Sequence, residues 1–423
     1  MNLNPLFKLF RRHEGYKKFD RAWLQGQASW VDNDLLRSRA LKLSETLEPR
    51  NDRFEIENAL NELSVSYDAA DFRRTACLMA YLTSRLFRDI SKAPSEEIRN
   101  KILEFKGPRF FFVNHSSYFD YIHAAGVTHR LGLPTPVMHV TGSVTDGWAA
   151  KWLKGFRALN VRKTLSPLAH RAYSWFSAAL AEKNEVQVLF ARTSRYTVRS
   201  RDGILREPYV PHSVISGVKA TGKALVIPIS ISYSVIPDDS YLTAPWFFPV
   251  LSMFPGNRLR VAPFVLGLRS PEKVLGKINE IFGDVSVGFG EPFELTDDNR
   301  LSLQRISHRA IEEIAKNKLI QPTHLVAKAL HGQSKLDLKT LRERFRQEVE
   351  NTTTFFKARY RKAPPFHPLI VSDIPQSVNV GLRMLSKRGA ISGSVIRRTY
   401  SPKNESLLSF YSYHADRRIY PLR

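Results

Sequence analysis

The chain has 423 residues, of which 43% are hydrophobic and 25% are charged, and 64 Lys and Arg against 40 Asp and Glu give a formal net charge of +24. This near-ordinary composition excludes collagen-like, low-complexity and wholly disordered chains. The length predicts roughly two or three domains. The charge predicts an anionic partner, which could be nucleic acid, an anionic membrane surface or a phosphorylated substrate.

Cysteine content and hydropathy indicate the compartment. The single cysteine, Cys77, excludes an internal disulfide and a cysteine-based zinc site, which favours a cytosolic or cytosol-facing protein. No apolar run reaches the roughly 18 to 20 residues that span a bilayer, so we expect no transmembrane helix. The basic and partly apolar segment 1–18 could lie on a membrane surface or pack on the rest of the fold.

The first part of the chain has a helical pattern. Between Asn33 and Lys92 good helix formers dominate and Pro49 is an interior breaker, while apolar residues recur at helical spacing at Leu78, Leu82, Leu86 and Ile90. The pattern predicts a helical N-terminal domain, which we assign to residues 1–95.

The middle of the chain alternates short apolar, β-branched or aromatic runs with helical stretches, which is typical of an α/β domain. We assign this domain to residues 96–297. The predicted strands cover residues 110–113, 136–140, 158–161, 186–190, 224–233 and 285–289.

The last part of the chain returns to a helical pattern, with helices predicted over residues 303–316, 325–331 and 336–362. Pro364, Pro365 and Pro368 then mark a boundary. Residues 298–423 are therefore predicted to form a mainly helical C-terminal extension and tail.

The segment richest in chemistry follows the first predicted strand of the α/β domain. That strand runs into His115, and Asp120 follows five residues later at the start of a helix predicted from Tyr118 to Arg130. On a regular helix this offset would turn the two side chains apart, so they can meet only if the backbone turns between them. Asp120 could then accept from one imidazole nitrogen and leave the other as a base for a hydroxyl. The alternative is a structural histidine at the surface or the core edge.

The order of several motifs resembles that of the glycerol-3-phosphate acyltransferase family, the glycerolipid acyltransferases with a His-x4-Asp motif. Residues His115 to Asp120 match that motif, and Gly290 lies in a Phe-Gly-Glu-Pro segment like the one that ends the family's domain. Residues 155–163 and 226–233 resemble the family's second and fourth blocks. The resemblance implies a central mixed sheet flanked by helices.

The family's third block, Phe-x-Glu-Gly-x-Arg-Ser-Arg, has two possible alignments here. Starting it at Phe190 puts Arg192 at the position of the glutamate, whereas aligning it on Arg199-Ser200-Arg201 puts Tyr196 there. The segments that resemble the second and third blocks contain basic residues, and the resemblance implies that such residues hold the acceptor phosphate: Arg162, Lys163, Arg192, Arg195, Arg199 and Arg201. The alternative is a solvated basic loop.

The resemblance also implies a reaction. A fatty acyl group would pass from an acyl thioester, either acyl-CoA or acyl-acyl carrier protein, to the sn-1 hydroxyl of glycerol 3-phosphate, the first step of phospholipid biosynthesis. His115 would be the base and Asp120 would orient it, with no metal or organic cofactor. The protein would be peripheral, on the cytoplasmic face of an anionic membrane.

Two other functions stay open at this point. The acceptor could be dihydroxyacetone phosphate or lysophosphatidate, or the chain could be a non-catalytic basic protein that binds membranes or nucleic acid on the same scaffold. No RNA-binding aromatic signature, helix-turn-helix or zinc-finger pattern is present, so we expect no nucleic-acid partner.

Overall fold

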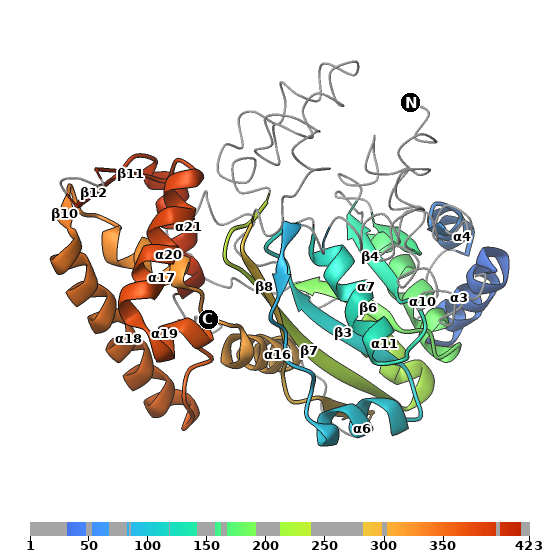
Figure 1. Ribbon diagram of the computed structural model, residues 1–423. Helices are drawn as coiled ribbons and strands as arrows, with labels where there is room; N and C mark the ends of the chain where they lie inside the picture. Colours follow the sequence, from blue (N-terminus) through green and yellow to red (C-terminus); the bar gives the residue numbers. More distant parts are fainter. Residues whose placement is uncertain are drawn as a thin grey trace, which may run out of the picture.

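A computed structural model describes residues 32–47, 53–66, 83, 86–117, 119–141, 157–161, 167–191, 212–237, 282–297, 303–394 and 398–415. At its centre is a mixed β-sheet with helices packed around it, which confirms the predicted α/β class (Figure 1). The basic segment 1–18 and Cys77 lie outside the described residues.

The sheet contains all six strands predicted from the sequence, each within one residue of its predicted ends. A parallel block at its centre runs from β5 to β7, while β1, β8 and β9 run antiparallel to their neighbours in that block. Across the sheet the order is β1 (Val65–Ser66), β5 (Ala158–Val161), β4 (Val137–Thr141), β6 (Gln187–Ala191), β3 (Arg109–Asn114), β7 (Lys223–Tyr233), β8 (Asp284–Phe289) and β2 (Arg88–Asp89), with β9 (Phe293–Thr296) also paired to β7.

Residues 110–113 of β3 are all apolar, as expected for a strand whose sheet is covered by helices on both faces. Side chains alternate along a strand, so Phe111 and Val113 join one buried cluster while Phe110 and Phe112 join another. The first cluster includes residues of α7 (Asp120–Arg130), and the second includes residues of α10 (Pro167–Glu182), α11 (His212–Thr221) and α16 (Leu303–Asn317).

The chain before the α/β region is helical in α3 (Asn33–Leu47) and α4 (Arg53–Asn61), and α6 (Glu96–Glu104) precedes β3. Both α3 and α4 pack on α10, with which they share a buried cluster. The guanidinium of Arg39 binds both carboxylate oxygens of Glu182, at 2.5 and 2.7 Å. This part of the chain therefore lies against the α/β core (Figure 1).

The predicted helical pattern that ends at Ile90 is wrong at Arg88–Asp89, which form β2. The edge of the sheet offers unpaired backbone groups at β8, and the amides of Arg88 and Ile90 donate to the carbonyls of Gly283 and Val285. The Arg88 side chain also binds the carboxylate of Asp284 at 2.6 Å. Pairing with the sheet thus overrides the local helical preference.

Two glycines near the end of β8 let α16 approach the sheet. A Cβ on Gly288 would lie 2.5 Å from the backbone oxygen of Asn317, and one on Gly290 would lie 2.7 Å from the Cβ of Glu313. Neither position has room for a side chain. The Phe-Gly-Glu-Pro segment thus closes the sheet against α16.

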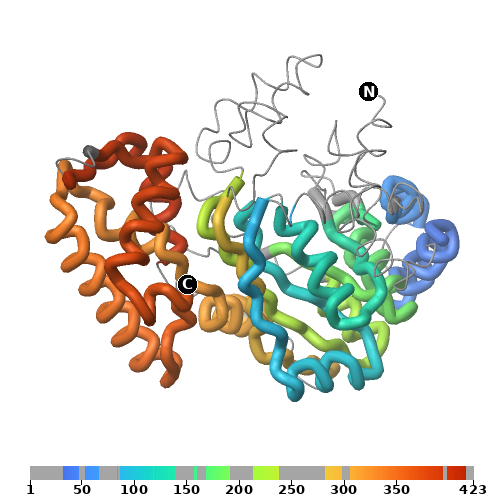
Figure 2. The backbone as a smooth tube through the Cα atoms, in the orientation of Figure 1, coloured from blue at the N-terminus to red at the C-terminus, as the bar shows by residue number. Residues whose placement is uncertain are grey.

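The last part of the described chain is mainly helical. After α16 come α17 (Pro322–Leu330), α18 (Leu338–Tyr360), α19 (Pro368–Ser372), α20 (Ile374–Lys387) and α21 (Glu405–Ala415). A small sheet, β10 (Leu336–Asp337), β12 (Thr399–Pro402) and β11 (Ile391–Ser394), joins them. Figure 2 shows the helices from α17 onward, in orange and red, gathered at one side of the main sheet.

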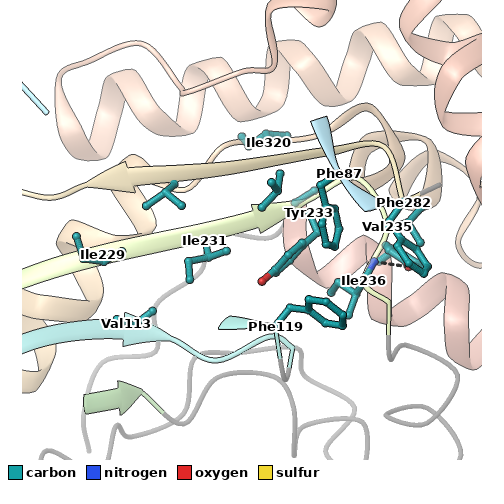
Figure 3. Packing of buried hydrophobic residues seen from close by; sticks show 14 of the residues in the cluster. Phe87, Val113, Phe119, Ile229, Ile231, Tyr233, Val235, Ile236, Phe282 and Ile320 are labelled. Carbon is teal, nitrogen blue, oxygen red and sulfur yellow. Dashed lines mark hydrogen bonds between the residues drawn. The ribbon is translucent and has the colours of Figure 1, made fainter. Parts of the chain in front are cut away.

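These helices share a buried core with the sheet. One apolar cluster runs from Leu86 to Ala415 and includes residues of β7, α17 and α21; part of it is drawn in Figure 3. None of the helices in the described ranges has the length and apolar character needed to cross a membrane.

Candidate active site

The turn between β3 and α7 begins with a side chain that extends the sheet. The backbone pairing of β3 with β7 reaches Val113 and Ile229. Beyond it the Asn114 amide accepts from the amide N–H of Ile231 at 2.5 Å and donates to the carbonyl of Ile231 at 3.0 Å. Asn114 is buried, and both the oxygen and the nitrogen of its side-chain amide are hydrogen-bonded. These bonds fix the position at which the chain leaves the sheet before His115.

The turn itself is organised by the carboxylate of Asp120. Its Oδ2 accepts from the backbone N–H groups of Ser116 and Ser117 at 2.5 and 2.8 Å. Asp120 is the first residue of α7, where a negative charge meets the positive end of the helix. The carboxylate of Asp120 therefore stabilises both the turn and the start of α7.

The backbone turns between His115 and Asp120, which is the condition under which the sequence allowed the two side chains to meet. Nδ1 of His115 lies 3.2 Å from Oδ2 of Asp120. Since a carboxylate can only accept, Nδ1 carries the hydrogen, and the lone pair of the neutral ring is then on Nε2. The rings of Tyr121 and Phe190 flank the imidazole at centroid distances of 5.4 and 5.1 Å.

A third member of the site was missed by sequence reasoning. The hydroxyl of Tyr233 donates to the other carboxylate oxygen of Asp120, Oδ1, at 2.6 Å. The two residues are 113 positions apart, so no local spacing connects them. The usable signal was the predicted strand that ends at Tyr233, because neighbouring parallel strands present their carboxyl ends at the same edge of a sheet.

A second histidine lies beside this group. His123, one turn further along α7, is buried, and burial lowers its pKa to about 4. Its ring lies 5.6 Å from that of Tyr233 and 5.8 Å from that of Phe87. Within the described part of the chain its Nε2 has no hydrogen-bond partner, so His123 contributes a neutral aromatic ring.

The six predicted phosphate ligands, Arg162, Lys163, Arg192, Arg195, Arg199 and Arg201, all lie outside the described residues. The strands that precede them are described. Strand β6 ends at Ala191, the register partner of Asn114, and β5 ends at Val161, the register partner of Thr141. Both strands therefore end at the edge of the sheet that carries His115.

Comparison with models of known protein families and with curated proteins finds no match to this chain. In the described ranges, no group of three or more His, Cys, Asp or Glu side chains is arranged to hold a metal ion. The chemistry of the His115 turn is therefore the basis for a functional assignment.

Proposed function

We propose that the protein transfers a fatty acyl group from an acyl thioester to the sn-1 hydroxyl of glycerol 3-phosphate, the first step of phospholipid biosynthesis. The observation that carries the proposal is the hydrogen-bonded pair of His115 and Asp120 at the carboxyl end of a central parallel strand. Open α/β sheets bind ligands at this edge.

The pair supports general-base catalysis without an enzyme nucleophile. As the substrate oxygen attacks the thioester carbonyl, Nε2 of His115 takes the hydroxyl proton, and Asp120 stabilises the imidazolium through Nδ1–H. When the C–S bond of the tetrahedral intermediate breaks, the imidazolium returns that proton to the departing thiolate. The products are the acylated glycerol phosphate and the free thiol.

Basic residues directly follow two of the strands that end at this edge, and they support an anionic acceptor. Arg192 directly follows Ala191, whose register partner Asn114 precedes His115, and Arg162 directly follows Val161. Guanidinium groups bind phosphate through paired hydrogen bonds. In the proposal Arg162, Lys163, Arg195, Arg199 and Arg201 hold the acceptor phosphate and so fix the distance from its hydroxyl to His115.

The net charge of +24 supports the same proposal at the level of the whole protein. The thioester donor carries phosphate groups, and the product enters a bilayer with anionic lipids. A basic protein is attracted to both. We therefore propose peripheral attachment to the cytoplasmic face of an anionic membrane.

The test is a transfer assay on the full chain with vesicles present. Labelled glycerol 3-phosphate, dihydroxyacetone phosphate and lysophosphatidate are each offered with acyl-CoA or acyl-acyl carrier protein, using wild type, His115→Ala and the exposed-site control His331→Ala. We expect transfer to glycerol 3-phosphate that His115→Ala abolishes and His331→Ala retains. Failure of every donor and acceptor pair, or normal turnover in His115→Ala, would overturn the proposal.

A further inference from the structure

Tyr233 stands at the junction of the candidate site and the C-terminal helices. It is the last residue of β7 and is 1% exposed. Figure 3 shows its side chain leaving β7 on the side that faces β3, with Phe87 and Phe119 beside it. Its hydroxyl ends 2.6 Å from Oδ1 of Asp120.

The ring of Tyr233 is held by its neighbours. The ring of Phe87 lies 5.4 Å away and that of His123 lies 5.6 Å away, centroid to centroid. Phe87 itself packs edge-on against Phe119 at 5.8 Å. In such a packed aromatic cluster a ring has one rotamer, so the position of the hydroxyl follows from the position of the backbone.

The backbone of Tyr233 is held in turn by the start of α17. Nε2 of His324 lies 3.1 Å from the Tyr233 carbonyl oxygen, and the hydroxyl of Thr323 donates to the carbonyl of Ser234 at 2.6 Å. Nδ1 of His324 accepts from the backbone N–H of Gln321 at 3.3 Å, which leaves Nε2–H as the donor to Tyr233. His324 and Thr323 are fully buried.

We infer that Tyr233 is a positioning residue for the proposed reaction, and that α17 sets its position through His324. The inference rests on the proposed function, because the Asp120 carboxylate matters to the rate only if His115 acts as a base. It assigns to the C-terminal helices a role in the geometry of a site to which they contribute no reacting group.

The physical reason lies in how the two oxygens of Asp120 are used. Oδ2 accepts from His115 and two backbone amides, and Oδ1 accepts from Tyr233. With Tyr233 in place, rotation of the carboxylate breaks hydrogen bonds on both oxygens. Tyr233 also draws negative charge toward Oδ1, which moderates the attraction of Oδ2 for a proton on His115.

Removal of the hydroxyl should therefore change both the rate and its pH dependence. The Tyr233→Phe variant keeps the packed ring and loses the hydrogen bond. The carboxylate then attracts the His115 proton more strongly, so the pKa of His115 should rise. His123 also lies near Asp120, but its pKa is about 4. An acid limb of the rate profile near neutral pH would therefore not come from His123.

The experiment compares wild type, Tyr233→Phe and Tyr173→Phe. Tyr173 is a matched control because it is also buried and its hydroxyl is also hydrogen-bonded, but its partner is His139 on β4. For Tyr233→Phe we expect kcat to fall about tenfold or more with little change in KM, and the acid limb of kcat/KM to move up by about half a pH unit or more. Tyr173→Phe should leave the pH profile in place. An unchanged profile in Tyr233→Phe would overturn the inference.

A second measurement does not depend on turnover. NMR titration of the His115 ring signals, assigned by their loss in His115→Ala, gives its pKa in each variant. If the chain proves to have no transfer activity, an upward shift in Tyr233→Phe still supports the coupling, and an unshifted His115 removes it. Failure of the proposed function and failure of this inference are thus separate results.

The role of α17 is tested by substituting His324. His324→Ala removes the donor to the Tyr233 carbonyl, whereas His324→Gln retains an N–H group in place of Nε2–H. We expect His324→Ala to raise the pKa of His115, as Tyr233→Phe does. In His324→Gln the rise should be smaller. An unshifted pKa in folded His324→Ala would limit the inference to Tyr233 and overturn the part assigned to α17.

Discussion

Nε2 of His367, at the start of α19, lies 2.8 Å from the carboxylate of Asp284 on β8, and this contact ties the C-terminal helices to the sheet. Burial by itself raises the pKa of Asp284, but hydrogen bonds from His367 and Arg88 outweigh it, and the pKa is lowered overall. Nδ1 of His367 also accepts from the backbone N–H of Leu369, so the ring serves α19 and β8 at once.

Substitution of His367 should therefore destabilise the protein. His367→Leu removes the buried partner of Asp284 and the cap of α19, and we expect a loss of about 2–4 kcal/mol in the free energy of unfolding. Urea titration measures it, with the exposed His331→Leu as the control. Because the folded pKa of Asp284 is lowered, its contribution is present above about pH 4 and is lost as the pH falls through the folded value. Equal midpoints for the two variants would contradict this assignment.

Substitutions of the proposed base and its partner should act on rate rather than folding. His115→Ala should lower kcat by about 10² to 10⁴-fold, the usual value of positioned proton transfer. Asp120→Asn should also be severe, because the neutral amide keeps only one acceptor oxygen and has no charge to stabilise the imidazolium of His115. Circular dichroism and the melting temperature of His115→Ala should stay near those of wild type. Near-normal turnover in His115→Ala would leave the site without its base.

Removal of a proposed phosphate ligand should act on the acceptor alone. Arg162→Ala, or alanine at Arg195, Arg199 or Arg201, should raise the acceptor KM by about ten- to 150-fold, the value of one charge-assisted contact, and leave the donor KM nearly unchanged. A loss that affects both substrates equally in every variant would show a folding defect instead.

Arg192 distinguishes the two alignments of the third block. Arg192→Glu restores the family's residue under the alignment that starts at Phe190. With that alignment and glycerol 3-phosphate as acceptor, the change should be tolerated or beneficial. If Arg192 instead binds a different acceptor, activity should collapse. Steady-state kinetics with each acceptor separate the two cases.

Two buried histidines should make the protein less stable in acid. Burial lowers the pKa of His123 to about 4 and that of His139 to about 3. Below about pH 6.5 the unfolded chain binds protons at these two positions, whereas the folded chain does not. Between that pH and the folded pKa of each histidine, the free energy of unfolding should therefore fall by up to about 1.4 kcal/mol per pH unit for each group.

His123→Phe should remove part of this acid sensitivity. The ring lies among aromatic side chains and its Nε2 has no hydrogen-bond partner within the described residues, so phenylalanine keeps the packing and cannot titrate. Urea midpoints at pH 7.5, 6 and 5 should decline less steeply than in wild type, and His331→Phe should follow wild type. An unchanged decline in His123→Phe would assign the acid sensitivity to other groups.

Membrane attachment should be electrostatic and shallow. High salt or alkaline carbonate should release much of the protein from a membrane pellet, because screening weakens exposed charges beyond about 10 Å at 0.1 M salt. Retention that only detergent breaks would contradict the peripheral attachment that we propose.

Local patterns in the sequence were sufficient for the strands and for the His115–Asp120 pair. The central strands are buried on both faces, so they appear as short apolar runs that need no knowledge of their neighbours. The pair depends on a turn of a few residues, and the turn is encoded where it occurs: a strand end, an aspartate and a helix start.

Only the tertiary structure decided which distant groups complete the site. Tyr233 reaches Asp120 because β7 is the parallel neighbour of β3, and no periodicity reports which strands are neighbours. Arg88–Asp89 became a strand for the same kind of reason, since β8 offered an open edge there. Hydrophobic period and turn chemistry are properties of a segment, whereas strand pairing and buried hydrogen bonds are properties of two surfaces that meet only in the folded chain.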